Sequence, residues 1–137
     1  LDVSIQAQVI NLLLNLKEEL DISYLFISHD LGVVEYFCDR VAVMYLGKIV
    51  EIADSQQIYD SPQHPYTQAL LNAIPRLGFG HIKQKTVLKG DIPVSAILPQ
   101  GCAFQNRCPI KEKRCEETIP PLKEVAPNHH VACLLKH

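Results

Sequence analysis

No hydrophobic run in this sequence is long enough to cross a membrane as a helix, and neither sign of charge is in large excess. The longest apolar run, Val41–Leu46, falls far short of the roughly 20 residues that such a helix needs. The formal net charge is −2, and the basic residues form one mild cluster of Lys111, Lys113 and Arg114. We therefore predict that any membrane association is through a partner and that no nucleic acid is bound.

The sequence also has nothing that resembles a secretory signal peptide, and it has no C-x2-C pair. Four of its five cysteines lie near the end of the chain, in a stretch rich in Pro. They are Cys102, Cys108, Cys115 and Cys133. Their spacing, C-x5-C-x6-C-x17-C, would let four thiolates converge from one loop-rich module, as iron–sulfur clusters and structural zinc require. Disulfides are expected in secreted chains, so two disulfides rank below a metal.

The ligand spacing also bears on which metal is bound. Zinc sites usually pair their ligands across two to four residues, which these cysteines do not do, although His129 or His130 could replace one cysteine. Pro109 directly follows Cys108, and a Cys-Pro step occurs in some cluster-binding segments. We favour an iron–sulfur cluster, with zinc and reduced structural thiols as the alternatives.

The chain changes character near its middle. Its first half is dense in Leu, Ile and Val, whereas after about Ser61 Pro recurs and apolar runs become short. We place a domain boundary between Asp54 and Ser61, which divides the chain into residues 1–56 and residues 57–137. A chain of 137 residues could form one ordinary domain, but this distribution favours the end of a larger domain with a small appendage.

The first candidate catalytic residue follows a predicted strand. Leucines recur with a helical period between Val9 and Leu20, so a helix is expected there, and Asp2 can cap its start. After it, the apolar run Tyr24–Ile27 predicts a buried parallel strand. The polar triplet that ends this strand would stand at the carboxyl edge of a sheet, where open α/β folds bind ligands. His29, at the centre of that triplet, is therefore the best catalytic candidate.

The remaining elements are a helix, a hairpin and a second helix. Asp30 is predicted to cap a helix at Leu31–Phe37. The apolar runs Val41–Leu46 and Ile49–Ile52, joined by a Gly-Lys turn, predict a β-hairpin at a sheet edge. A helix is also expected between Ser61 and Leu77, where it would dock the tail on the adjoining domain.

Two stretches in the first half resemble the ATP-binding subunits of ABC transporters. The stretches are Leu1-Asp2, placed before the first helix, and Phe26–Leu31, which reads FISHDL. Asp39–Glu51 is similar to the strand pair that follows the switch histidine in that family. Together these residues form a contiguous match to the end of such a subunit.

The second half resembles one group within that family, the oligopeptide and dipeptide importers. His64–Leu71, which reads HPYTQALL, is similar to the segment that opens the group's C-terminal extension, and Gly90–Pro93 is similar to a later loop of it. The four cysteines look like the pattern that carries a 4Fe-4S cluster in members of the group.

The resemblance implies a fold and a set of functional residues. The fold would be α/β: the C-terminal end of a P-loop NTPase domain at residues 1–56, then a small, loop-rich, cysteine-containing extension at residues 57–137. His29 would be the switch histidine that contacts the γ-phosphate of ATP, with Mg²⁺ present in the intact subunit. Asp2 would belong to the loop that crosses between two ATP-binding subunits.

The resemblance also implies partners, a cargo and a location. The partners would be a second ATP-binding subunit and the transmembrane permease subunits. The cargo would be oligopeptides, dipeptides or nickel, and the protein would lie at the cytoplasmic face of the plasma membrane, held there by the permease.

The sequence departs from the family in what it lacks. No G-x-x-x-x-G-K-[ST] phosphate-binding loop occurs, and Gly47-Lys48 reads as a hairpin turn. We therefore expect the chain to be a fragment that does not hydrolyse ATP alone. The alternative is an independent iron–sulfur or zinc-binding interaction module without catalysis.

Overall fold

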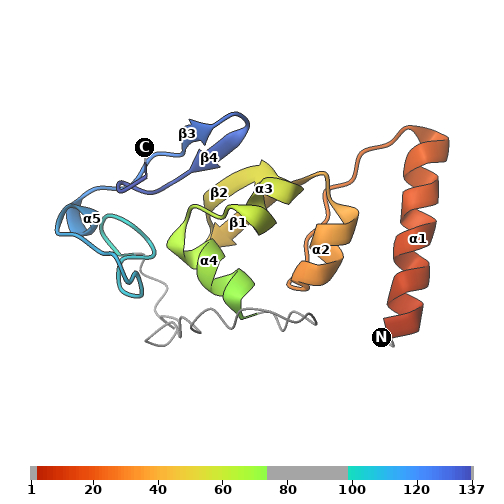
Figure 1. Cartoon of the computed structure of the whole chain (residues 1–137), viewed down its shortest axis with the longest axis horizontal. Coiled ribbons are helices and arrows are strands. Elements are labelled where there is room, and N and C mark those ends of the chain that lie inside the picture. The colour runs from red at the N-terminus through yellow and green to blue at the C-terminus, as the bar shows by residue number, and fades with distance from the viewer. Residues whose placement is uncertain (1–2, 74–98, 137) are drawn as a thin grey trace. The chain divides into compact units, whose positions relative to one another are not determined.

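The structure is a computed structural model that describes residues 3–73 and 99–136 (Figure 1). Asp2, the loop Gly90–Pro93 and most of the segment between the helix at residues 65–72 and the cysteines lie outside the described residues. The chain forms two compact units, Leu1–Asp39 and Arg40–His137, and each is described by itself. Helices and strands are both present, as the sequence predicts. None of the described helices combines the length and the hydropathy that a membrane crossing requires.

The first unit contains two helices, α1 at Val3–Leu20 and α2 at Leu31–Phe37. Both were expected from the sequence. The predicted cap of α2 is also confirmed, because the Asp30 side chain accepts hydrogen bonds from the N–H groups of Gly32, at 3.0 Å, and Val33, at 3.2 Å. An ion pair of 2.6 Å between Lys17 and Asp39 links α1 to the residues that follow α2.

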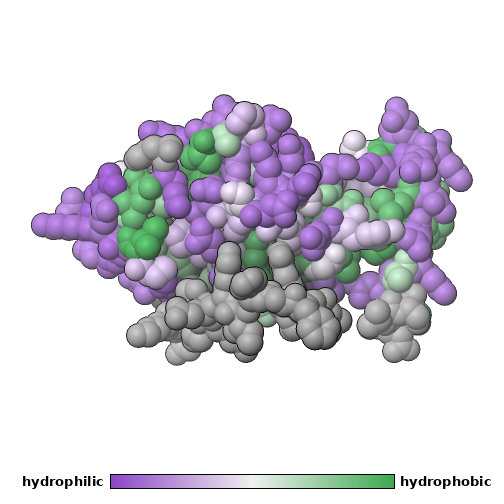
Figure 2. Space-filling view, viewed as in Figure 1, coloured by the Kyte–Doolittle hydropathy of each residue, from purple (hydrophilic) through white to green (hydrophobic). Residues whose placement is uncertain are grey.

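The expected strand at Tyr24–Ile27 is wrong, because this segment has no regular secondary structure. Leu25 is 92% exposed and Ile27 is 88% exposed, whereas the rings of Tyr24 and Phe26 pack against Phe37 at centroid distances of 5.9 and 5.0 Å. A strand needs a neighbouring strand to pair its backbone groups, and no strand is found among the described residues of this unit. Apolar side chains consequently reach the surface, where Figure 2 shows them among hydrophilic ones.

The second unit is built on a four-stranded antiparallel sheet in the order β1-β2-β4-β3 (Figure 1). The strands are β1 at Arg40–Tyr45, β2 at Lys48–Asp54, β3 at Lys123–Ala126 and β4 at His129–Val131. The predicted hairpin at the sheet edge is confirmed by β1 and β2. Leu46 and Gly47 turn between them with positive φ angles of 46° and 74°, a geometry that suits a right-twisted hairpin. The last part of the chain thus joins the sheet beside β2.

Three short helices are found in the described part of this unit. They are α3 at Ser55–Asp60, α4 at Pro65–Asn72 and α5 at Arg114–Glu117. The helix expected between Ser61 and Leu77 is therefore present as α4, with Pro65 in its first turn and His64 as its N-cap.

An aromatic cluster forms part of the core of the second unit. Phe104, which is 1% exposed, contacts the rings of Tyr45, Tyr66 and His64 at centroid distances of 5.1, 5.4 and 5.6 Å. These rings come from β1, from α4 and its cap, and from the loop that follows Cys102. The cluster thereby fixes the first cysteine-bearing loop to the hairpin and α4.

Gly101, next to the first of these cysteines, cannot be replaced without strain. Its φ is +80°, and an added Cβ would lie 2.6 Å from the carbonyl oxygen of Glu116. We expect Gly101→Ala to lower the free energy of unfolding by at least about 2 kcal/mol, measured by urea denaturation. Gly47→Ala is the matched control, because φ is +74° there but nothing lies within 4 Å of the added Cβ. Equal losses in the two variants would contradict the proposed clash.

Candidate functional site

His29 lies at the surface of the first unit, directly before α2. Its two neighbours shape this turn, because the Asp30 N–H donates to the Ser28 hydroxyl oxygen at 3.0 Å while the Asp30 carboxylate caps α2. The His29 ring is thus exposed on a structured turn, where it can reach a bound ligand. Asp2, the other residue predicted to take part in nucleotide binding, lies outside the described residues.

The four candidate metal ligands all belong to the second unit, and none is in a disulfide. Cys115 is buried in α5, and the other three are half-buried. The Cys102 N–H donates to the Cys115 carbonyl oxygen at 2.8 Å, which brings the first and third cysteines together. The Cys108 thiol lies within electrostatic range of the thiols of Cys102, Cys115 and Cys133. The four thiols therefore lie in the same part of the second unit.

The backbone around two of these thiols affects their acidity. Burial raises the pKa of the Cys102 and Cys108 thiols, and nearby backbone N–H groups, of Phe104 and Gln105 for Cys102 and of Ile110 for Cys108, oppose that rise. The Gln105 N–H itself donates to the Cys102 carbonyl oxygen at 3.1 Å. Metal ligation requires the deprotonated thiolate, which these N–H groups favour.

The donor set fits a metal, but the described side chains do not yet form a closed site. In residues 3–73 and 99–136, no three His, Cys, Asp or Glu side chains are placed so that they could hold a metal ion. The structure places four thiols, which are suitable metal ligands, in one small module.

A buried carboxylate, which the sequence analysis did not single out, lies at the junction of three segments. Glu51 in β2 is 0% exposed. It accepts hydrogen bonds from the backbone N–H groups of Gln63, at 2.7 Å, and His64, at 2.9 Å. It also accepts one from Nε2 of His129 in β4, at 2.6 Å. The only sequence signal for it is an acidic residue that stands between the apolar residues Val50 and Ile52 in β2.

His64 is buried beside this carboxylate. Burial lowers the pKa of His64 to about 4, although the negative charge of Glu51 acts in the opposite direction. Its Nδ1 accepts the N–H of Tyr66 at 3.1 Å, so the neutral ring caps α4. His64 therefore has a structural role at the start of α4.

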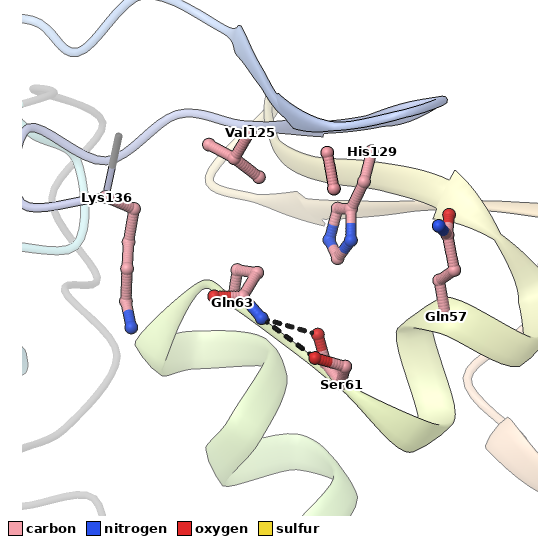
Figure 3. Close-up of a pocket in the computed structure, with 7 residues that line it drawn as sticks. Gln57, Ser61, Gln63, Val125, His129 and Lys136 are labelled. Carbon is pink, nitrogen blue, oxygen red and sulfur yellow. Dashed lines mark hydrogen bonds between the residues drawn. The ribbon is translucent and has the colours of Figure 1, made fainter.

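A cavity of about 250 Å³ lies between α3, the turn before α4 and the β3–β4 hairpin (Figure 3). The His129 ring points into it from β4. The side-chain amide N–H groups that line this cavity donate to other groups of the protein, whereas Oε1 of Gln57 is buried without a partner among the residues that the structure describes. Gln63 donates to the carbonyl and hydroxyl oxygens of Ser61, and Gln57 donates to the carbonyl oxygen of Pro127. None of the four cysteines lines it, so it is separate from the thiols.

Comparison with known proteins gives the family context of both units. Residues 50–115 match the family described as "Oligopeptide/dipeptide transporter, C-terminal region". The chain is 55% identical over 134 residues to a putative peptide import ATP-binding protein of Brucella ovis, which covers 98% of this chain and 42% of that protein. It is also 55% identical over 137 residues to the oligopeptide transport ATP-binding protein AppF of Bacillus subtilis, with the same two shares covered.

A more distant relative extends the same pattern. The chain is 47% identical over 133 residues to the dipeptide transport ATP-binding protein DppF of Haemophilus influenzae, which covers 97% of this chain and 41% of the relative. The chain thus spans less than half the length of the relatives that it matches. Residues 50–115 thus match the oligopeptide/dipeptide transporter C-terminal region family, and nearly the whole chain is similar to one part of proteins named for peptide import.

Proposed function

We propose that this chain forms the C-terminal part of the ATP-binding subunit of an ABC importer, which couples ATP hydrolysis to the import of oligopeptides or dipeptides. The observation that carries the proposal is the 55% identity, across 98% of the chain, to proteins named for peptide import. Residues 1–56 would complete the P-loop NTPase domain, and residues 57–137 would form its extension.

The partners follow from the same homology. A second ATP-binding subunit and the transmembrane permease subunits would complete the transporter, at the cytoplasmic face of the plasma membrane. Cargo is selected by other subunits in such importers, so nickel is a second candidate cargo beside peptides.

His29 is the proposed catalytic residue of this chain. ATP and Mg²⁺ supply the phosphoryl group and its charge neutralisation when bound. The His29 imidazole donates a hydrogen bond to the γ-phosphate and helps to hold the attacking water in line, which is where phosphoryl transfer gains most of its rate. Asp2 would link this site to the one on the second subunit.

We expect His29→Ala to lower the turnover number for ATP about 100-fold in the native polypeptide, because a positioned proton-transfer or orienting group contributes on that scale. Steady-state release of inorganic phosphate measures it. Glu117→Ala, an exposed position on α5, is the control and should leave turnover unchanged. Wild-type turnover in the His29 variant would remove this residue from the mechanism. Purified residues 1–137, which have no phosphate-binding loop, should show no turnover at all.

We also propose that Cys102, Cys108, Cys115 and Cys133 hold a 4Fe-4S cluster, with zinc as the alternative metal. The cysteine spacing and the electrostatic proximity of the four thiols support this assignment. A bound cluster would contribute folding free energy to a module that has little apolar core.

The cluster can be tested by composition. Protein purified without oxygen is expected to contain about four iron and four sulfide ions per chain, and Cys108→Ser should remove most of the iron and lower the melting temperature. Zinc in place of iron would select the alternative metal. Loss of iron with an unchanged melting temperature would refute the structural role.

A further inference from the structure

The Glu51 carboxylate connects β2 to two segments that follow it at long sequence distance. One segment is the turn before α4, through the N–H groups of Gln63 and His64. The other is β4, through His129. Both segments belong to residues 57–137, whereas Glu51 lies in residues 1–56. A single buried side chain thus fixes the extension to the hairpin at two places.

The attachment of β4 determines where the fourth cysteine lies. At the start of β4, His129 is bonded to Glu51. Just after its end, the Ala132 N–H donates to the Val50 carbonyl oxygen at 2.8 Å. The next residue in the chain is Cys133. Register in a sheet is set by such contacts, and a shift of one residue would turn alternate side chains to the opposite face.

The other three thiols are held by different contacts. Phe104 fixes the loop after Cys102 in the aromatic cluster, and the backbone bond between Cys102 and Cys115 joins that loop to α5. Cys133 lies two residues after the end of β4, so its position follows the placement of that strand. An error in the pairing of β4 would therefore remove one ligand and leave three.

An apolar residue at position 51 could not replace the carboxylate. Burial of an ionised carboxylate costs several kcal/mol, which is tolerated only when good donors surround it. Here two backbone N–H groups and one imidazole N–H do so. These three hydrogen bonds together fix β2, β4 and the turn before α4 in one arrangement.

We propose that Glu51 is a positioning residue of the four-thiol site, which acts through His129 to set the register of β4 and so bring Cys133 to the other thiols. The inference rests on the proposed metal function of those cysteines. It assigns to Glu51 and His129 a role in metal retention although neither is a ligand.

The test compares iron release to a chelator from four variants of the native polypeptide, purified without oxygen. His129→Gln keeps an N–H donor of similar reach for Glu51, whereas His129→Leu fills similar space without a donor. Glu51→Gln places an amide N–H against a backbone donor. Ile58→Val, which trims a buried side chain of α3 away from these bonds, controls for lower stability alone.

We expect iron release to be about ten-fold faster in His129→Leu and Glu51→Gln, the usual scale for loss of an outer-shell partner. Their absorption spectra should change as well. His129→Gln and Ile58→Val should release iron at close to the wild-type rate. Equal rates in His129→Gln and His129→Leu would overturn the proposal, even if Glu51→Gln failed to fold. Absence of metal from the wild-type protein would instead refute the cluster and this role with it.

Discussion

Glu51→Ala is expected to lower the free energy of unfolding by about 3–5 kcal/mol, the range found when one partner of a buried pair is removed. The substitution leaves the N–H groups of Gln63 and His64 and the Nε2 of His129 without their common acceptor. Each buried donor without a partner costs about 1–3 kcal/mol. A loss of this size is a large share of the total stability of an ordinary domain.

Urea denaturation followed by circular dichroism measures this loss. Glu124→Ala is the matched control, because Glu124 also accepts a backbone N–H, that of Asn128 at 3.1 Å, but lies exposed in β3. An exposed acceptor is replaced by water, so the control should lose less than about 1 kcal/mol. Similar losses in both variants would mean that the Glu51 junction does not hold the sheet and the extension together.

The second large effect is a dependence of stability on pH that comes from His64. Burial lowers the pKa of His64 from 6.5 to about 4 in the folded protein. The unfolded chain therefore binds more protons than the folded one between these two values. The free energy of unfolding is therefore not reduced by His64 above about pH 6.5, and it falls as the pH drops toward about 4. The two pKa values correspond to a loss of about 3 kcal/mol.

His64→Asn isolates this contribution. Asn is a good N-cap residue, so its side-chain oxygen can accept the Tyr66 N–H, but it does not titrate. The variant should be less stable at neutral pH, since a buried ring is lost beside Phe104. Its free energy of unfolding should nevertheless change with pH about 3 kcal/mol less than that of the wild type between pH 6.5 and 4. Parallel pH profiles for the two proteins would show that His64 is not the titrating group.

Much of the local structure follows from the sequence because its causes are local. The helical period at α1, the Asp30 cap of α2 and the Gly-containing turn between β1 and β2 each depend on residues close in the chain. The strand predicted at Tyr24–Ile27 fails for the opposite reason, because a strand depends on a second strand from elsewhere in the chain to pair with it.

The site could be predicted only in part. The spacing predicts that four cysteines form one metal site, and this stays a prediction because no three described His, Cys, Asp or Glu side chains are placed so that they could hold a metal ion. Nothing in the sequence indicates what positions these cysteines. The bond between Glu51 and His129 spans 78 residues, and no local pattern encodes such a contact. His129 was weighed as a spare zinc ligand, whereas the described side chain is bonded to a carboxylate.

The proposed role of this chain is in ATP-driven peptide import. The most direct test is uptake of a labelled oligopeptide by cells in which the native gene is deleted and replaced by either the wild-type or the His29→Ala version, with both proteins present in equal amounts. The account predicts that wild type restores uptake and that His29→Ala reduces it to the level of the deletion. Restoration by both versions would contradict the role of His29, and restoration by neither would contradict peptide import itself.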